Sequence, residues 1–227
     1  MTALLLFSAA FMAQGDLSGE WVGHCGWGAA VTRTRHHHRL VRVITPDSIE
    51  VLEWSAEWER YDDASLRPWY SDREIVVEPV RATFRRESGN RFRAQDRVIE
   101  FGAAEGDLDL CQTMGGEYQL KKELAGIKPS FSCQKASQPR ERAICASPQL
   151  SLLDRHLALA YQAAQDRMMM NTETKAQGQA VIRKLQALQS AWWSNTLAKC
   201  QSADCVEPLY TARIAELTAM GRKPETR

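Results

Sequence analysis

The first half of the chain alternates between apolar and polar positions with a period near two, and turn residues recur between the alternating runs. This pattern predicts short β-strands at residues 19–25, 40–45, 48–54, 74–85, 91–101, 108–112 and 117–122. Thr45-Pro46-Asp47-Ser48 and Ser88-Gly89-Asn90 are typical turn sequences between two such runs. Short strands at near-regular spacing favour an antiparallel barrel or sandwich.

From residue 129 onward the apolar residues recur at helical spacing instead. They predict helices around residues 150–164, 181–192 and 206–217. Ser147 before Pro148 is an expected helix start, Asp204-x-x-Glu207 resembles a capping box, and Asn171-Thr172 separates the first two helices. We therefore predict an α+β protein with two domains: an antiparallel β-barrel-like domain at residues 16–124 and a disulfide-stapled α-helical domain at residues 129–221.

The N-terminus predicts export. Residues 3–13 are apolar or small, which is too short for the roughly 20 residues that span a bilayer but typical of a signal peptide. Ala13-Gln14-Gly15 offers a cleavage site, so residues 1–15 are the expected signal peptide, although no Lys or Arg precedes the apolar run. A buried first strand or helix is the alternative. No Cys follows the run, so we expect a periplasmic or secreted protein without a membrane anchor.

Six cysteines in an exported chain predict three disulfides. Cys25 falls in the first predicted strand and Cys111 in one of the last two. The first and last strands of a closed meander are neighbours, so we expect a disulfide between Cys25 and Cys111. The other four allow three pairings. An antiparallel helical hairpin favours pairings in which Cys133 and Cys145 each bond to one of Cys200 and Cys205. No CxxC pair is present, so zinc is disfavoured.

Charge changes this picture in one respect. The net charge is +1, which excludes a global basic bias toward nucleic acid. Residues 130–227 hold 13 basic and 8 acidic residues, a net +5, and the rest of the chain is therefore −4.

The run His36-His37-His38 could suggest a metal site. Neighbouring side chains of an extended chain point to opposite faces, however, and Arg35 and Arg39 flank the run. We interpret it as a solvated basic turn and expect neither metal nor cofactor.

Residues 53–70 combine aromatic and acidic side chains, a composition that holds sugars or cationic partners. The alternatives are structural anchoring of a long inter-strand segment and a pair of glycosidase carboxylates. The candidates for partner binding in this stretch are Trp54, Glu57, Trp58, Glu59, Asp62 and Asp63.

The helical half resembles a known family in its ordered cysteines and aromatic residues. The residues that carry the resemblance are Phe131, Cys133, Ala136, Glu141, Ile144, Cys145, Leu150, Leu153, Asp154, Tyr161, Gln189, Trp192, Cys200, Cys205, Tyr210, Arg213, Ile214 and Leu217. Together they are similar to LprI-type lysozyme inhibitor domains. The resemblance implies a small exported helical module associated with lysozyme inhibition.

The β half has shorter resemblances. Gly19-x-Trp21 and Gly116-x-Tyr118-x-Leu120 are similar to lipocalin-like barrels. Ser88-Gly89-x-Arg91-Phe92 resembles the loop of periplasmic C-type lysozyme inhibitors, which implies that Ser88 enters the lysozyme cleft.

The chemistry-bearing residues of the helical half have a structural interpretation as well. Tyr161, Trp192 and Tyr210 lie on apolar faces and are expected in the core, where Asp154 and Arg213 are expected to form a semi-buried pair. The sequence contains no GxSxG, HExxH or P-loop motif, so we expect a binding protein and not an enzyme. The leading hypothesis is an inhibitor that occludes the cleft of lysozyme or another peptidoglycan hydrolase. The alternative is an envelope interaction module with a small-ligand or glycan site in the β half.

Overall fold

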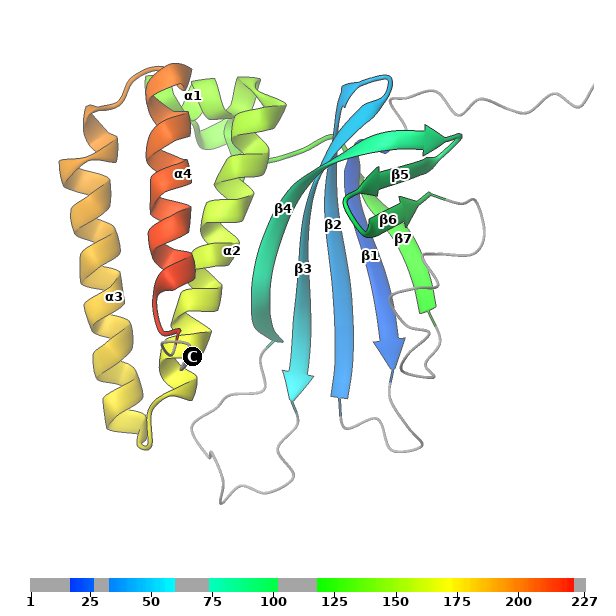
Figure 1. The fold of residues 1–227 in the computed structure, drawn as a ribbon. Coiled ribbons are helices and arrows are strands. Elements are labelled where there is room, and N and C mark those ends of the chain that lie inside the picture. The colour runs from blue at the N-terminus through cyan, green and yellow to red at the C-terminus, as the bar shows by residue number, and fades with distance from the viewer. Residues whose placement is uncertain (1–16, 27–32, 60–73, 102–117, 223–227) are drawn as a thin grey trace, which may run out of the picture.

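The computed structural model describes residues 17–26, 33–59, 74–101 and 118–222. An antiparallel sheet precedes four α-helices in these residues, which confirms the α+β class (Figure 1). The strands are β1 (Gly19–Gly26), β2 (Arg33–Thr45), β3 (Ser48–Glu59), β4 (Glu74–Ser88), β5 (Arg91–Ala94), β6 (Arg97–Glu100) and β7 (Tyr118–Ala125). The helices are α1 (Pro139–Ala146), α2 (Pro148–Met170), α3 (Lys175–Asn195) and α4 (Ala203–Ala219), with 3-10 turns η4 (Cys133–Lys135) and η5 (Leu197–Lys199).

The sheet is not closed into a barrel. Its strand order is β6-β5-β4-β3-β2-β1-β7, so that β6 and β7 form its two edges within the described residues. β4 curls, and β5 and β6 fold back over the face that points away from the helices (Figure 1). β5 and β6 have four residues each, and in the described part of the chain β6 pairs only with β5. The predicted barrel is therefore correct only in its antiparallel meander and its curvature.

Several strands differ from the predicted boundaries. β2 begins at Arg33, so the histidine run His36-His37-His38 lies inside a strand; the prediction of a solvated turn is wrong there. The strand predicted at residues 91–101 is divided, because Gln95 has a positive φ of 55° in the turn between β5 and β6. The predicted turns at Pro46-Asp47 and Gly89-Asn90 are confirmed. The strand predicted at residues 108–112 and the signal peptide lie outside the described residues.

The curled face of the sheet has its own apolar cluster. Its members come from β2 to β6 and the flanking positions: Leu17, Val41, Ile49, Val51, Phe84, Phe92, Ile99 and Phe101. Phe84 and Phe92 are fully buried, and Trp21 packs at the edge of the cluster with its ring centroid 5.2 Å from that of Phe101. The short strands β5 and β6 thus cover this side of the sheet.

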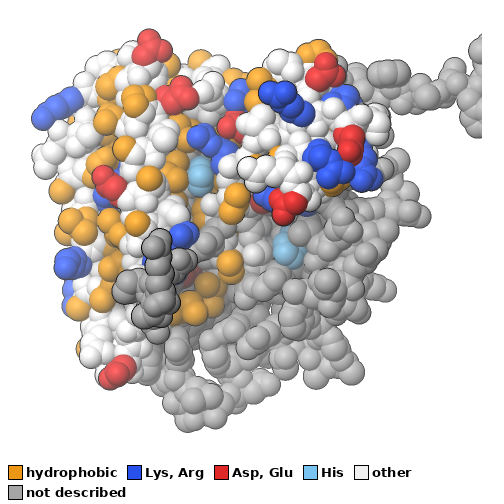
Figure 2. Space-filling view, in the orientation of Figure 1, with side chains coloured by type: hydrophobic (Ala, Val, Ile, Leu, Met, Phe, Trp, Pro, Cys, Tyr) orange, Lys and Arg blue, Asp and Glu red, His pale blue; other side chains and the backbone are white. Residues whose placement is uncertain are grey.

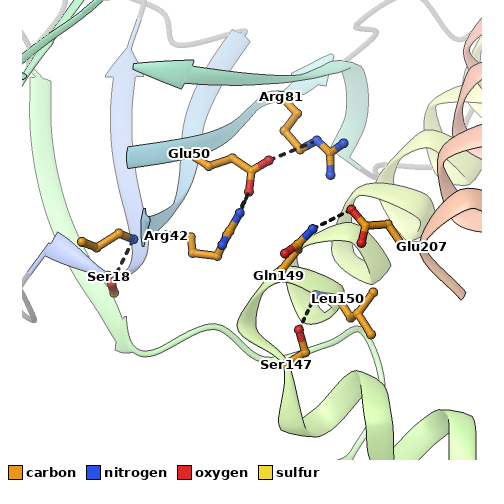
Figure 3. A network of polar contacts seen from close by, with 9 residues as sticks. Ser18, Arg42, Glu50, Arg81, Ser147, Gln149, Leu150 and Glu207 are labelled. Carbon is orange, nitrogen blue, oxygen red and sulfur yellow. Dashed lines mark hydrogen bonds and ion pairs between the residues drawn. The ribbon is translucent and has the colours of Figure 1, made fainter. Parts of the chain in front are cut away.

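Local capping explains where the helices begin. Ser147 accepts a hydrogen bond from the Leu150 amide at 3.2 Å, as predicted (Figure 3). Thr174 and Gln177 form a capping box at the start of α3. α4 begins at Ala203 with Ser202 as its N-cap residue, so the predicted capping box at Asp204 is wrong. Glu207 instead accepts a hydrogen bond from the side-chain amide nitrogen of Gln149 in α2 at 2.5 Å.

The helices enclose a second core on their inner faces. Its main buried members are Ile144, Leu150, Leu153, Leu157, Ala160, Leu185, Leu197, Val206, Tyr210 and Leu217. Trp192 and Tyr161 pack against this core while partly buried, which confirms their predicted structural role. α3 contributes few buried residues, among which Leu185 is completely buried.

The cysteines of the helical half pair locally, which corrects the predicted crossed pairing. Cys133 bonds to Cys145 and Cys200 bonds to Cys205, with Cα–Cα distances of 5.8 and 5.6 Å. The first disulfide ties η4 to α1, and the second ties the end of η5 to the first turn of α4. Each closes a short segment that has too few apolar residues to hold itself in place. Cys111 lies outside the described residues and the side chain of Cys25 is not among them, so the Cys25–Cys111 bond stays a prediction.

The two halves share a third apolar cluster. Leu40, Leu52, Trp54 and Val76 of the sheet pack against Leu152 and Ala163 of α2. Figure 1 shows α2 lying between the sheet and the other helices, with α3 farthest from the sheet. One face of α2 is therefore covered by the helical core and the opposite face by the sheet.

Candidate functional site

Trp54, one of the predicted partner-binding residues, belongs to this shared cluster. Its side chain is only 7% exposed, and its ring stacks on His38 with centroids 4.8 Å apart and planes 5° from parallel. Trp54 therefore anchors the sheet to α2 and offers no exposed aromatic platform. This matches the structural alternative considered for residues 53–70.

The other predicted residues divide into two groups. Glu57, Trp58 and Glu59 have their backbone in β3, but their side chains are not among those described, and Asp62 and Asp63 lie outside the described residues. Ser88 is exposed at the end of β4, immediately before the turn that leads to β5. A role for these residues in binding a partner stays a prediction.

The junction between the halves contains several polar groups. Glu20 lies 3.8 Å from His38 and 3.5 Å from Arg155, and the neighbouring His38 imidazole is the main reason why the pKa of Glu20 is lowered. Asp166 of α2 accepts a hydrogen bond from the Val76 amide of β4 at 3.1 Å. These contacts occupy the sheet-facing side of α2, so this side of the helix is not open to solvent.

His156 is a further buried group at this junction. Burial lowers the pKa of His156 to about 4, with the positive charge of Arg81 as the second cause, although a hydrogen bond to the Pro79 backbone acts in the opposite direction. The imidazole is therefore neutral near pH 7. Among the described residues, no group of three or more His, Cys, Asp or Glu side chains is placed to hold a metal ion.

The predicted Asp154–Arg213 pair is not formed. Asp154 accepts hydrogen bonds from the Ser130 amide at 2.6 Å and from the Tyr210 hydroxyl at 3.2 Å. Arg213 donates to Gln189 at 3.0 Å and to Glu216 at 2.7 Å. Both side chains are buried and point to different partners, so each fixes a separate helix contact.

The outer surface of α3 points away from the sheet, from which α3 is the farthest helix (Figure 1). Its sequence, KAQGQAVIRKLQALQSAWWSN, contains three basic residues and no acidic residue. Leu188 and Trp193 are 45% and 40% exposed. Near the start of α3, Met169, Gly178 and Ile182 line a groove of about 410 Å³ whose rim includes Lys175 and Arg183. Figure 2 shows hydrophobic side chains scattered over the helical part of the surface.

At the other end of α3, Arg140 of α1 lies against Trp193. The Arg140 guanidinium carbon is 5.6 Å from the centroid of the Trp193 ring, within the range of a cation–π contact. Arg140 is only 9% exposed, its Nε has no hydrogen-bond partner, and its Nη1 makes one long bond of 3.5 Å to the Ala198 carbonyl. Within the described residues, Arg140 forms no ion pair. We call Arg140 and Trp193 the α1–α3 corner.

Sequence reasoning missed both residues of this corner. One signal was present, because adjacent residues of a helix point about 100° apart and only one of Trp192 and Trp193 can enter the core. Trp192 faces Tyr210, with ring centroids 6.1 Å apart, and Trp193 faces outward. Nothing in the sequence distinguishes Arg140 from the other basic residues of its segment.

The chemistry of the α1–α3 corner is that of protein recognition. A buried guanidinium without an anionic partner is unfavourable, and a carboxylate is its strongest hydrogen-bonding partner. Trp and Arg are also the residues most enriched among those that dominate binding energy at interfaces. The described helices and strands form a disulfide-stapled helical module joined to a curled sheet.

Comparison with known families agrees with this class. Residues 133–217 match the family model described as lysozyme inhibitor LprI, which confirms the resemblance predicted from the sequence. The description of the family is that of an inhibitor and not of an enzyme. No curated protein and no solved structure gives a significant match to the chain.

The covalent structure agrees with an exported protein. The two disulfides of the helical half are typical of chains that fold in an oxidising compartment. Among the described helices, none has the length and apolar character needed to cross a membrane.

Proposed function

We propose that the protein is an exported inhibitor of lysozyme or a related peptidoglycan hydrolase and acts by occluding the substrate cleft. The family match over residues 133–217 supports this function. We choose the α1–α3 corner as the binding surface because of its Arg140 side chain. This guanidinium is buried beside the half-exposed ring of Trp193 and forms no ion pair among the described residues.

The chemistry of the target supports the same surface. Glycosidases carry a pair of carboxyl groups in the cleft that binds the sugar chain. A guanidinium matches a carboxylate in geometry and charge. We infer that Arg140 meets a cleft carboxylate while Trp193 and the apolar part of α3 cover the neighbouring sugar-binding surface.

In this proposal the long-range electrostatic attraction to a basic lysozyme comes from the β half and not from the helical half. The helical half carries +5, so it is not complementary to a basic lysozyme as a whole. The acidic stretch at residues 53–70 stays the predicted complement of a basic target, with Glu57, Glu59, Asp62 and Asp63 among its five acidic residues against two arginines. In this arrangement the β half accelerates encounter and the helical half supplies the specific contact.

A small-ligand or glycan site in the β half has less support. His37, Arg39, Glu53, Trp54 and Arg97 are among the residues that line a recess of about 180 Å³, below the roughly 300 Å³ at which small-molecule pockets begin. Arg39 and Glu53 form a 2.7 Å ion pair in its wall. The recess is small and its charged groups contact each other.

Calorimetric titration of the full chain with lysozyme tests the proposed surface. Trp193→Ala and Arg140→Met are each expected to weaken binding about tenfold or more, as is typical of residues that dominate an interface. Replacing an unpaired buried charge by an apolar side chain of similar length removes a desolvation cost, so Arg140→Met is expected to fold. Arg142→Met is the matched control because Arg142 is an exposed arginine of the same helix. Equal affinities for Arg140→Met and Arg142→Met would contradict the proposed contact.

A further inference from the structure

A second surface, distinct from the α1–α3 corner, lies on the curled end of the sheet. Residues 81–97, which cover the end of β4, all of β5 and the start of β6, contain six arginines and two acidic residues, a net +4. The remainder of the β half is therefore strongly acidic, because the half as a whole is −4. Figure 2 shows Lys and Arg side chains gathered over this part of the described surface.

Strand alternation sorts these arginines onto two faces. Phe84 and Phe92 are fully buried on the inner face, so Arg85 and Arg93 lie on the outer face. Arg85 and Arg93 are directly opposite each other in the β4–β5 register, and both are exposed. Like charges opposite each other on a sheet are destabilising, since their Cβ atoms are about 5 Å apart. We call Arg85, Arg91 and Arg93 the arginine face.

Among the described side chains, Glu87 is the carboxylate that contacts the arginine face, and the β5–β6 register places Glu100 opposite Arg91. Glu87 accepts hydrogen bonds from Arg91 at 2.8 Å and Arg93 at 2.9 Å, and these two bonds, that from Arg93 first, lower the pKa of Glu87. Arg85 makes no ion pair within the described residues. Arg81, farther along β4, differs because Glu50 lies 3.5 Å from it, between Arg81 and Arg42 (Figure 3).

The scaffold beneath the arginine face is held in place from the inner side. Arg86 lies 4.6 Å from the centroid of the Phe92 ring, and its Nε donates to the Pro46 carbonyl at 2.9 Å. The Arg86 amide donates to the Asp47 carbonyl at 2.8 Å, which ties the β4–β5 hairpin to the β2–β3 turn. The outer guanidinium groups therefore stand on a fixed hairpin.

We propose that the arginine face binds an anionic polysaccharide. The Cβ positions of its arginines are about 5 Å apart across the strands and about 7 Å apart along them. Guanidinium groups carried at this spacing can contact successive carboxylate or sulfate groups of a linear chain. Insertion into a lipid surface is disfavoured because the large apolar side chains of this segment, Phe84 and Phe92, are buried. Single-stranded nucleic acid is disfavoured because the described residues of the hairpin have no exposed aromatic ring for base stacking.

Salt-dependent binding of the full chain to heparin, used as the probe, tests the proposal. The double substitution R85A/R93A is expected to weaken heparin binding about tenfold, in line with the loss of two exposed charge contacts. R142A/R183A removes two exposed arginines of the helical half and is expected to bind heparin like the unsubstituted chain. R85K/R93K keeps the charge and loses the forked geometry, and it is expected to bind with intermediate affinity.

Three outcomes would overturn the proposal. The first is equal heparin affinity of R85A/R93A and the unsubstituted chain, and the second is an equal loss in R142A/R183A. The third is tighter binding, through Arg85 and Arg93, to single-stranded DNA or to vesicles of anionic lipid than to heparin. Lysozyme inhibition is a separate readout that R85A/R93A is expected to leave unchanged, so a failure of this proposal and a failure of the proposed function are distinguishable.

Discussion

At the scale of single residues, Asp154 joins the segment before η4 to α2 and α4. Its two carboxylate oxygens accept hydrogen bonds from the Ser130 amide and the Tyr210 hydroxyl. Burial raises the pKa of Asp154, and burial together with the charge of Asp154 raises the pKa of Tyr210 well above its usual range. Tyr210 therefore stays protonated and remains a hydrogen-bond donor at all physiological pH values.

Tyr210→Phe is expected to lower the free energy of unfolding by about 1–3 kcal/mol, because a buried oxygen of Asp154 loses its donor. Urea denaturation of the full chain measures the change. Tyr161→Phe is the control, since Tyr161 is half-buried and its hydroxyl has no hydrogen bond among the described residues; its effect is expected to be below about 0.5 kcal/mol. Equal effects of the two substitutions would contradict the role assigned to Asp154.

His156 gives the protein a pH dependence at the junction of its halves. Its pKa is about 4 in the folded chain, mainly because of burial, and about 6.5 when unfolded. Between these values the unfolded chain binds a proton that the folded chain does not bind, so stability is lost as the pH falls from about 6.5 to about 4.

Urea denaturation between about pH 7 and pH 4 tests this dependence. The unsubstituted chain is expected to lose up to about 3 kcal/mol more than His156→Gln over this range. Gln can still donate to the Pro79 carbonyl but does not titrate. Glu20 and Asp154 titrate in both proteins, so their contributions cancel in the difference. Parallel pH profiles of the two proteins would show that His156 is not the group responsible.

Some single residues were predictable and others were not. The core positions of Tyr161, Trp192 and Tyr210 follow from helical spacing, and the structure confirms them. The pairing of Asp154 with Arg213 was wrong, because spacing gives the side of a helix but not the rotation between neighbouring helices. The rotation that the helices adopt places the Asp154 carboxylate against Tyr210 and leaves Arg213 beside Gln189.

At the scale of elements, the disulfides hold short segments and not the helix hairpin as a whole. Cys133–Cys145 spans 12 residues and Cys200–Cys205 spans 5. Crossed pairing assumed that both cysteine pairs meet at one end of the bundle. The sequence could not exclude local pairing, because 3-10 turns such as η4 and η5 bring near neighbours within disulfide distance and have little sequence signal of their own.

Peptide mapping without reduction is expected to find Cys133 linked to Cys145 and Cys200 linked to Cys205. Replacing Cys133 and Cys145 by Ser is expected to cost about 3 kcal/mol of stability, and replacing Cys200 and Cys205 about 2 kcal/mol, because the shorter loop restricts the unfolded chain less. Thermal or urea denaturation gives the two values. A crossed peptide such as Cys145–Cys200 would refute the local pairing.

The strands also show where local patterns stop being informative. β2 continues through the basic run at residues 35–39 because β1 and β3 pair with it on both sides along this run. A run of consecutive His and Arg residues contains neither the alternation nor the β-branched residues that indicate a strand. Pairing with two neighbours overrides this weak local preference.

At the scale of the whole molecule, the sheet and helices behave as one packed unit. Leu152 and Ala163 of α2 are fully buried against the sheet, and Asp166 bonds to the backbone of β4. The sequence predicted two domains and left their contact open, since the apolar residues of α2 could equally have belonged to the helical core. Likewise, nothing in the sequence around Trp54 shows that its ring lies on the face of the sheet that packs on α2.

Leu152→Ala is expected to destabilise both halves together by about 2–4 kcal/mol through the cavity it leaves. Tryptophan fluorescence and far-UV circular dichroism are expected to report one coincident unfolding transition in this variant and in the unsubstituted chain. Leu188→Ala, at a position that is 45% exposed, is the control and is expected to change stability by less than about 0.5 kcal/mol. Two separate transitions in the unsubstituted chain would contradict the shared core.

The whole molecule presents two outward surfaces, the α1–α3 corner for a protein partner and the arginine face for an anionic polysaccharide. Clearing of a suspension of bacterial cell walls by lysozyme, followed with increasing amounts of the full chain, tests the proposed inhibition most directly. The expected result is a dose-dependent loss of lysozyme activity that saturates at one protein per lysozyme, is retained by Arg142→Met and is strongly reduced in Trp193→Ala. Full lysozyme activity at a large molar excess of the protein would contradict the proposed function.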